Sequence, residues 1–329
     1  METPAAERIT RVRSVQDLFE RLGARLKLRW LNDGQGHDNP LRGDGPSTAR
    51  QTLVGTLNCI HPNRIQILGQ AEVLYLADLG PTAYLETVEK LFTGQPAAIV
   101  FSEEIEPQAD FYDWARETRI ALLGSSLSDQ ELIANLQYFL NHALAERSTV
   151  HGVVLEVFSM GVLLTGEASI GKSELALDLI CRGHRLIADD VPEFARIAPD
   201  TLHGSCPPLL ADFLEVRGLG VLNIRAMFGD SAVRRKKELN LVVDLQRLND
   251  AELAALDRLS GSLSTRNILG VPVPQVTVPV APGRNMAILV EAAVRHQILR
   301  LNGYDASVDF TERQARLLTE EPPAQDTHA

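Results

Sequence analysis

Gly166-Glu-Ala-Ser-Ile-Gly-Lys-Ser173 is the stretch of the sequence that decides the fold. It satisfies the pattern G-x-x-x-x-G-K-[ST], which a chain of this length contains by chance on the order of once in a hundred cases. An apolar run at residues 162–165 precedes it, and apolar side chains at helical spacing follow it up to Gly183. A strand, a glycine-rich loop and a helix in this order direct backbone N–H groups toward phosphates. The segment therefore predicts a P-loop nucleotide site; a glycine-rich turn that only caps a helix is the alternative.

The loop also suggests roles for two of its side chains. Lys172 would reach the β- and γ-phosphates of ATP, and the hydroxyl of Ser173 would bind Mg²⁺. The remaining candidate nucleotide-binding residues surround the phosphates mainly with backbone N–H groups, and they are Gly166, Glu167, Ala168, Ser169, Ile170 and Gly171.

Two adjacent carboxylates, Asp189 and Asp190, end a short apolar run. A helix over residues 172–182 would carry the chain roughly 16 Å from the loop at 1.5 Å per residue, and six extended residues would return it by roughly 20 Å. Both acids therefore come back level with Ser173. One can support the Mg²⁺ shell while the other accepts a proton, and by analogy with other P-loop enzymes Asp190 is the predicted base. A solvated Asp-Asp turn before Pro192 is the alternative.

The rest of the chain suggests two folded domains, because 329 residues are long for one compact core. Helical and strand patterns alternate in the N-terminal part, which predicts an α/β domain. These patterns lie at residues 15–22, 83–92, 97–101 and 120–123. Ser128 and Glu131 form a capping-box pattern, which opens a helix expected to end near Arg147.

In the C-terminal part, a hairpin over residues 153–165 leads into the P-loop. A helix at 286–301 stops before Gly303, and a shorter helix is expected at 311–318. We therefore expect three regions: an N-terminal α/β domain at 1–130, a P-loop kinase domain at 131–310, and a C-terminal helix with a disordered tail at 311–329.

The composition argues against a nucleic-acid-binding, a disulfide-rich or a membrane-spanning protein. Lys and Arg number 32 against 43 Asp and Glu, a formal net charge of −11, which argues against nucleic acid or an anionic membrane as the main partner. The basic run at 234–237 is expected to be an exposed face, with docking of an acidic protein surface as the alternative. Cys59, Cys181 and Cys206 suggest inert, packed thiols rather than disulfides or a zinc cluster. No run approaches the ~20 apolar residues of a membrane span, so we expect a cytoplasmic protein.

Several segments together resemble the HPr kinase/phosphorylase family. They are His151-Gly-Val153, the P-loop, Arg182-Gly-His-Arg-Leu-Ile-Ala-Asp-Asp190, Leu214-Glu-Val-Arg-Gly-Leu-Gly-Val-Leu-Asn223 and Pro279-Val-Ala-Pro-Gly-Arg-Asn285. The resemblance is strong from about residue 130 to 310, whereas the N-terminal part matches the family only in length and α/β character. It implies a P-loop fold like that of phosphoenolpyruvate carboxykinase.

The resemblance implies a protein serine kinase that phosphorylates the phosphocarrier HPr with ATP and Mg²⁺ and regulates carbon metabolism. It also implies the reverse reaction, in which inorganic phosphate removes the phosphoryl group as pyrophosphate, and assembly as a homohexamer. The implied metal ligands are Ser173 and Glu215. The implied catalytic residues are His151, Lys172, Asp189, Asp190 and Arg258, and the implied dephosphorylation loop is Pro279, Val280, Ala281, Pro282, Gly283 and Arg284.

The chain departs from the family pattern in two places. Ala168-Ser169 stands where the family usually has Ser-Gly, and Ala281 stands where many members have Arg. The first concerns the flexibility of the P-loop, and the second removes a possible phosphate contact. Two other functions stay open at this point: a P-loop kinase of a small metabolite, and a nucleotide-binding regulator without turnover.

Overall fold

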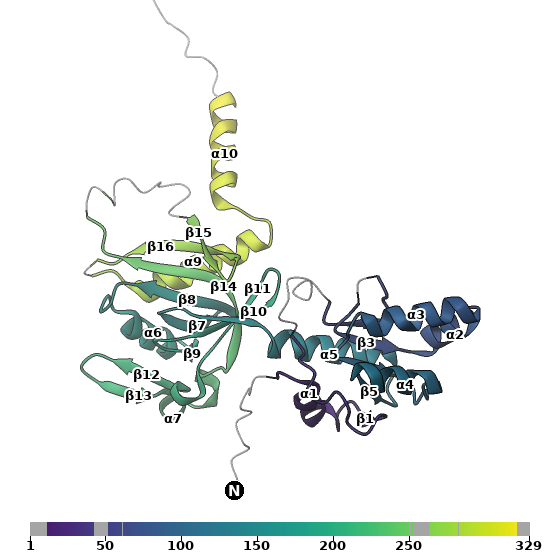
Figure 1. Ribbon diagram of the computed structural model, residues 1–329. Coiled ribbons are helices and arrows are strands. Elements are labelled where there is room, and N and C mark those ends of the chain that lie inside the picture. The colour runs from purple at the N-terminus through teal and green to yellow at the C-terminus, as the bar shows by residue number, and fades with distance from the viewer. Residues whose placement is uncertain are drawn as a thin grey trace, which may run out of the picture. The chain divides into compact units, whose positions relative to one another are not determined.

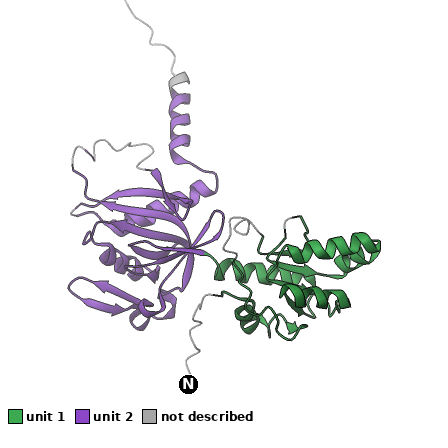
Figure 2. Ribbon diagram, in the orientation of Figure 1, with its two compact units in different colours: residues 1–145 green, residues 146–329 purple. Residues whose placement is uncertain are grey.

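The computed structural model describes residues 12–42, 52–60, 62–249, 252, 263–281 and 283–320. It divides into two compact units, Met1–Ala145 and Glu146–Ala329, which Figure 2 shows in green and purple. Both units combine β-sheet with helices, so the predicted α/β fold with two folded parts is confirmed. Among the described residues, no helix is both long and apolar enough to span a membrane.

Unit 1 is built on a five-stranded sheet in the order β1-β5-β4-β3-β2. Strands β2 to β5 run parallel, and β1 pairs antiparallel with β5. The residues of β3, β4 and β5 are all buried, as expected for strands that helices cover on both faces. The strands are β1 (Arg29–Trp30), β2 (Val54–Thr56), β3 (Ile65–Leu68), β4 (Ala98–Phe101) and β5 (Ala121–Gly124).

The helices of unit 1 belong to two apolar clusters. Residues of α1 and α5 pack in one cluster with the strands, and residues of α2, α3 and α4 pack in another. The helices are α1 (Val15–Leu22), α2 (Gln70–Asp78), α3 (Pro81–Thr93), α4 (Ala109–Thr118) and α5 (Asp129–Ala143). The helices and strands predicted for the N-terminal part are therefore found where the sequence places them.

Helix α5 begins as predicted but ends earlier. Its capping box forms, since Ser128 Oγ accepts a hydrogen bond from the Glu131 N–H at 3.3 Å and the Glu131 carboxylate accepts one from the Ser128 N–H at 3.2 Å. The helix stops at Ala143 rather than near Arg147, because residues 146–149 pair in a strand instead. Its apolar face packs into the core of unit 1. The structure thus divides the chain after residue 145, whereas the sequence placed the boundary near 130.

Unit 2 contains a nine-stranded sheet with the path β6-β10-β11-β14-β8-β7-β9; off this path, β16 pairs with β14, and β15 pairs with β16. The long strand β14 pairs antiparallel with β11 through its first residues and parallel with β8 and β16 through its later ones (Figure 1). Its strands are β6 (Glu146–Thr149), β7 (Val153–Val157), β8 (Met160–Gly166), β9 (Arg185–Ala188), β10 (Glu193–Ala198), β11 (Thr201–Ser205), β14 (Lys236–Gln246), β15 (Leu263–Ile268) and β16 (Val271–Pro279).

The hairpin predicted before the P-loop is formed by β7 and β8. Phe158 and Ser159 lie between the strands and both have positive φ, 45° and 65°, the conformation of the tight turn that matches the twist of a two-residue hairpin. Val157 pairs with Met160 at this turn. The hairpin fixes the direction of β8, and therefore the position at which the P-loop begins.

Helices α6 (Lys172–Cys181) and α9 (Met286–Leu301) pack into one apolar cluster with β7, β8 and β14. A separate two-stranded hairpin, β12 (Phe213–Val216) and β13 (Gly220–Asn223), leads into α7 (Ile224–Phe228). The short 3-10 turns η2 (Pro208–Leu210) and η3 (Asp230–Ala232) flank these elements. The last helix, α10 (Ala306–Glu320), is longer than the predicted 311–318, and the tail predicted to be disordered lies outside the described residues from 321 onward.

Candidate active site

The P-loop connects the end of β8 to the start of α6, as the motif predicts. Gly166 ends β8 with φ of 141°, and a Cβ there would lie 2.5 Å from the Leu245 carbonyl oxygen of β14. Gly171 precedes α6 with φ of 103°. Glycine is needed at both positions, because side chains rarely adopt these φ values and β14 leaves no room at the first. The loop therefore turns sharply against β14 and presents the N-terminus of α6.

Lys172 folds back over the loop. Its Nζ donates hydrogen bonds to the carbonyl oxygens of Gly166 at 3.0 Å and Glu167 at 2.9 Å. Within the described parts of the chain, no carboxylate forms an ion pair with this ammonium group. The charge is thus held beside the loop by neutral acceptors, which an anionic ligand can replace.

Asp189 returns to the P-loop, as the helix and strand lengths predict. It follows β9, and its Oδ1 accepts a hydrogen bond from Ser173 Oγ at 3.4 Å, while its Oδ2 accepts one from the Glu215 N–H at 2.9 Å. The side chain is buried. Burial raises the pKa of the Asp189 carboxyl, and the hydrogen bond from the Glu215 N–H opposes this shift.

Asp190 points to a different partner. His151 Nδ1 lies 3.1 Å from Asp190 Oδ1, and both side chains are more than half exposed. Asp190 has a φ of 64°, and its carbonyl oxygen accepts a hydrogen bond from the Gly152 N–H at 3.1 Å. The adjacent acids are therefore separated in space: one is buried at the P-loop serine and the other is accessible beside a histidine.

The β12–β13 hairpin brings two further side chains to this region. Leu214 and Val216 are buried in the core of unit 2, whereas Glu215 projects from the other face of β12, and Arg217 lies in the turn that follows the strand. Arg217 Nη2 donates a hydrogen bond to Ser169 Oγ in the P-loop at 2.7 Å. Sequence reasoning missed Arg217, because its partner Ser169 lies 48 positions away in the chain.

The oxygen atoms around Ser173 fit a magnesium site. The Ser173 hydroxyl and the Asp189 carboxylate are adjacent, and the Glu215 backbone touches the same carboxylate. Oxygen donors of this kind suit Mg²⁺. In the described part of the chain, no cluster of three or more His, Cys, Asp or Glu side chains could hold a metal alone. That agrees with a nucleotide-bound Mg²⁺, which takes one or two protein ligands and completes its shell with phosphates and water.

The predicted dephosphorylation loop begins one strand away from the P-loop. Strand β14 lies between β8 and β16, with Leu245 opposite Gly166 and Gln246 opposite Pro279. The Val280 N–H donates to the Gln246 carbonyl oxygen at 2.8 Å. Two strand spacings of about 4.8 Å each put the two loop origins roughly 10 Å apart. Pro282 lies outside the described residues.

Beneath both loops, Asp244 joins the strands through its side chain. It accepts hydrogen bonds from Thr165 Oγ1 at 2.7 Å and from Gln246 Nε2 at 2.6 Å. Thr165 belongs to β8 and is buried. This polar contact between the strands was also missed by sequence reasoning, because Asp244 and Thr165 are 79 positions apart.

Arg258, the remaining implied catalytic residue, lies outside the described residues. The prediction of packed thiols is wrong for Cys181, which is exposed. Cys59 and Cys206 are partly buried, and burial raises the thiol pKa of both, that of Cys206 to about 11.

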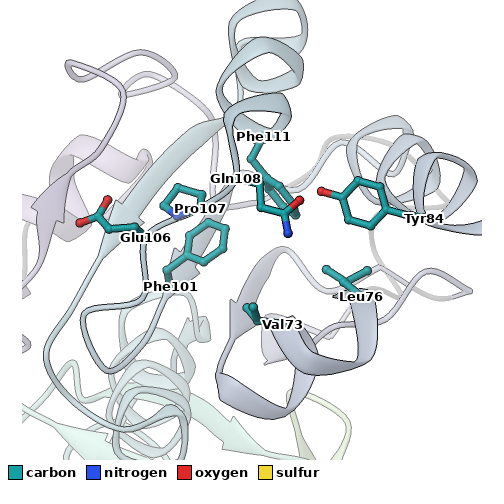
Figure 3. Close-up of a pocket in the computed structure, with 8 residues that line it drawn as sticks. All are labelled: Val73, Leu76, Tyr84, Phe101, Glu106, Pro107, Gln108 and Phe111. Atoms are coloured by element: carbon teal, nitrogen blue, oxygen red, sulfur yellow. The ribbon is translucent and has the colours of Figure 1, made fainter. Parts of the chain in front are cut away.

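Unit 1 contains a small hollow between α2, α3 and the segment that follows β4, which Figure 3 shows with its lining side chains. Phe101, Phe111 and Leu76 make much of its wall, and its volume of about 20 Å³ is enough for one water molecule. The lysine, the hydroxyl and the carboxylates described above all belong to unit 2.

The strand, loop and helix of unit 2, with a lysine, a hydroxyl and a carboxylate at the loop, place the chain among the P-loop proteins. The family described as HPr Serine kinase C-terminal domain matches residues 142–314, and the one described as HPr Serine kinase N terminus matches residues 14–140. The chain therefore belongs to the HPr serine kinase family. The resemblance is confirmed, and it extends over the N-terminal part as well.

Individual relatives agree with this assignment. The HPr kinase/phosphorylases of Xylella fastidiosa (strain M12) and Xanthomonas axonopodis pv. citri (strain 306) are each 45% identical over 311 residues, which cover 94% of this chain and 98% of the relative. A solved structure of the Hpr(Ser) kinase/phosphatase from Coxiella burnetii is 39% identical and covers 50% of this chain and 98% of its own, with a TM-score of 0.44.

Proposed function

We propose that this chain is a bifunctional enzyme that phosphorylates a serine of the phosphocarrier protein HPr with ATP, and that reverses the reaction with inorganic phosphate to release pyrophosphate. The observation that carries the proposal is the grouping at the P-loop: Asp189 beside Ser173, and Asp190 beside His151. The 45% identity to named HPr kinase/phosphorylases over 94% of the chain supports the choice of substrate.

In the forward direction, the Asp190 carboxylate would accept the proton of the serine hydroxyl as that oxygen attacks the γ-phosphorus of ATP. Its exposure suits a group that must meet a protein substrate, and His151 at 3.1 Å would orient it. Lys172 would exchange its carbonyl acceptors for phosphate oxygens and balance the charge of the transferring group. Mg²⁺, when bound, would neutralise further phosphate charge, and Ser173, Asp189 and Glu215 are the residues that would hold it.

The reverse reaction can use the same groups. Inorganic phosphate would occupy the position of the β-phosphate and attack phosphoserine. The same Asp190 carboxylate would accept the proton of the attacking phosphate oxygen and pass it to the serine oxygen as the bond between that oxygen and phosphorus breaks. The products are pyrophosphate and the free serine hydroxyl. Since ATP and phosphate compete for one site, their concentrations would set the direction.

Several finer features belong to the same proposal and rest on the family resemblance. They are a homohexameric assembly, a cytoplasmic location, and regulation of carbohydrate metabolism through the sugar phosphotransferase system. A catalytic contribution from Arg258 and a role of residues 279–284 in dephosphorylation also stand as proposals.

The direct test is to incubate the protein with MgATP and purified HPr and to measure the mass of HPr and of its peptides. We expect one added phosphoryl group on a serine, and its removal with release of pyrophosphate when inorganic phosphate replaces ATP. The Lys172→Ala variant serves as the control for a contaminating kinase. ATP that binds without being consumed would indicate a regulator, and turnover that ignores HPr would indicate a metabolite kinase.

A further inference from the structure

The P-loop of this chain contains a residue in a conformation that side chains disfavour. Ser169 has a φ of 63°, in the left-handed region. Glycine adopts this region without steric penalty, whereas a residue with a Cβ does so at a cost in free energy. The serine must therefore be held in place by an interaction that glycine does not make.

Arg217 supplies that interaction. Its Nη2 donates to Ser169 Oγ at 2.7 Å, and the bond is charge-assisted because the donor is a guanidinium group. Among the described residues, no carboxylate forms an ion pair with Arg217. Arg217 lies in the turn directly after β12, two residues beyond Glu215, whose backbone N–H donates to Asp189. The hairpin is thus joined to the site at two points: at Asp189 and at the P-loop itself.

We propose that Arg217 is a positioning residue which, through Ser169 Oγ, holds the P-loop in its nucleotide-binding conformation before ATP arrives. The contact also couples the loop to the hairpin that carries Glu215. A preformed loop loses less conformational freedom when the phosphates bind, so the contact should appear as affinity for MgATP. This inference rests on the proposed nucleotide site and adds a residue that acts on it indirectly.

The experiment measures the dissociation constant of MgATP for five test variants and one control variant of the full chain beside the wild type. The single variants are Ser169→Ala, Ser169→Gly, Arg217→Ala and Arg217→Lys, and the double variant combines Ser169→Gly with Arg217→Ala. Ser169→Ala keeps the disfavoured φ but loses the acceptor, whereas Ser169→Gly loses both. Arg235→Ala is a matched control, since Arg235 is an exposed arginine beside β14 at the end of that strand away from the P-loop.

We expect Ser169→Ala and Arg217→Ala each to weaken MgATP binding by roughly threefold to tenfold, the range of one modest hydrogen bond. Ser169→Gly should lose less than Ser169→Ala, because glycine relieves the disfavoured φ. Arg217→Lys should regain part of the affinity, since an ammonium group can also donate to the serine. In the Ser169→Gly background, Arg217→Ala should cost less than about twofold, because its partner is already gone.

A second readout separates positioning from folding and from direct catalysis. The loss in Arg217→Ala should appear in KM for MgATP rather than in kcat, with an unchanged melting temperature. An equal loss of affinity from Arg217→Ala in both serine and glycine backgrounds would mean that Arg217 acts without Ser169, and the inference would be overturned. Failure of the wild type itself to bind MgATP would instead remove the nucleotide site, and the inference with it.

Discussion

Two buried carboxylates lie at opposite ends of β9, and their surroundings differ in charge. At one end, Glu156 is 6% exposed and lies within 4 Å of three cations: Arg185 Nη1 at 3.2 Å, Arg234 Nη1 at 2.6 Å and Lys237 Nζ at 3.6 Å. At the other end, Asp189 is 9% exposed and accepts hydrogen bonds from a hydroxyl and a backbone N–H. Among the described residues, no Lys or Arg pairs with it.

The difference separates a structural charge from a functional one. A buried carboxylate surrounded by cations is already compensated, and its loss should affect stability. The P-loop end contains a carboxylate without a cation, Asp189, and a cation held only by carbonyl oxygens, Lys172. In the proposed function, MgATP would supply both missing charges, a divalent cation for the acid and phosphates for the lysine. The charges that the protein leaves uncompensated therefore indicate which charges the ligand would carry.

The largest effect should come from removing the uncompensated cation. We expect Lys172→Ala to abolish both kinase and phosphorylase activities, a loss of roughly 10³-fold, because preorganised charge on the transferring group is lost. The melting temperature should stay close to that of the wild type, since no carboxylate is left unpaired. Activity is measured as phosphoryl transfer to HPr and as pyrophosphate release. Kinase activity within tenfold of the wild type would refute the role of Lys172.

The next largest effect concerns the exposed acid. Asp190→Asn should lower both rates by roughly 10²-fold, the lower end of the contribution of a general base, with little change in stability because the side chain is solvent-accessible. The matched variant is Asp189→Asn, which should instead weaken the affinity for Mg²⁺ and so raise the Mg²⁺ concentration that the reaction requires. If Asp189→Asn impairs proton transfer and Asp190→Asn alters only the Mg²⁺ requirement, the two roles are reversed.

A moderate effect is expected at Glu215, the implied metal ligand on the hairpin. Glu215→Gln should raise the Mg²⁺ concentration needed for half-maximal activity by roughly 10- to 100-fold in both directions, because a ligand of the metal is replaced by a neutral amide. Its backbone bond to Asp189 should survive the substitution. A Mg²⁺ titration that matches the wild type would remove Glu215 from the site.

The compensated end of β9 should respond in stability rather than in activity. Glu156→Gln leaves three cations without their carboxylate, and we expect a loss of about 1–3 kcal/mol, below the range for fully buried pairs because both arginines are 43% exposed. Urea unfolding at pH 7 measures this loss. If Glu156→Gln kept normal stability but lost kinase activity, the assignment of Glu156 to stability rather than to function would be wrong.

At the other end of β9, the ionisation of Asp189 should lower the stability of the folded chain as pH rises. Burial raises its pKa in the folded state, so the folded chain binds the proton more tightly than the unfolded chain. Its ionisation therefore lowers stability as pH rises from the unfolded pKa, near 3.8, through the folded value. Asp189→Asn should abolish this contribution and leave the chain as stable as the wild type, or slightly more stable, at pH 7. Urea unfolding between pH 4 and pH 7 in the absence of Mg²⁺ provides the measurement.

The sequence predicted the parts of this site that depend on short segments. The P-loop, the helix after it and the return of Asp189 to Ser173 follow from motif and element length alone. Arg217 and Asp244 could not be found in this way, because their partners Ser169 and Thr165 are 48 and 79 positions away in the chain. The early end of α5 was missed for the same reason, since residues 146–149 pair with β10, about 45 positions later, instead of continuing the helix.

The smallest effect, and the most specific, is expected at Arg284. This exposed residue follows Gly283 in the loop after β16, and its N–H donates to the Ala281 carbonyl oxygen at 3.3 Å. Like Lys172, its side chain has no carboxylate partner among the described residues, so it can bind an incoming anion. Ala281 adds no charge to the loop. Arg284 is thus a cation that could hold inorganic phosphate or phosphoserine in a bidentate manner.

A group needed for incoming phosphate, but not for ATP already bound by the P-loop, should affect the two directions unequally. We expect Arg284→Ala to lower phosphorolysis by roughly tenfold, about the value of one charge-assisted contact, and the kinase reaction by less. Ala281→Arg should lower the apparent KM for phosphate if it restores a contact in the same loop. Pyrophosphate release from phosphoserine-HPr and ATP-dependent phosphorylation are measured with the same enzyme preparation. Equal losses in both directions for Arg284→Ala would mean that the loop serves a step common to the kinase reaction and phosphorolysis. Arg284 would then act in both reactions, as Lys172 does.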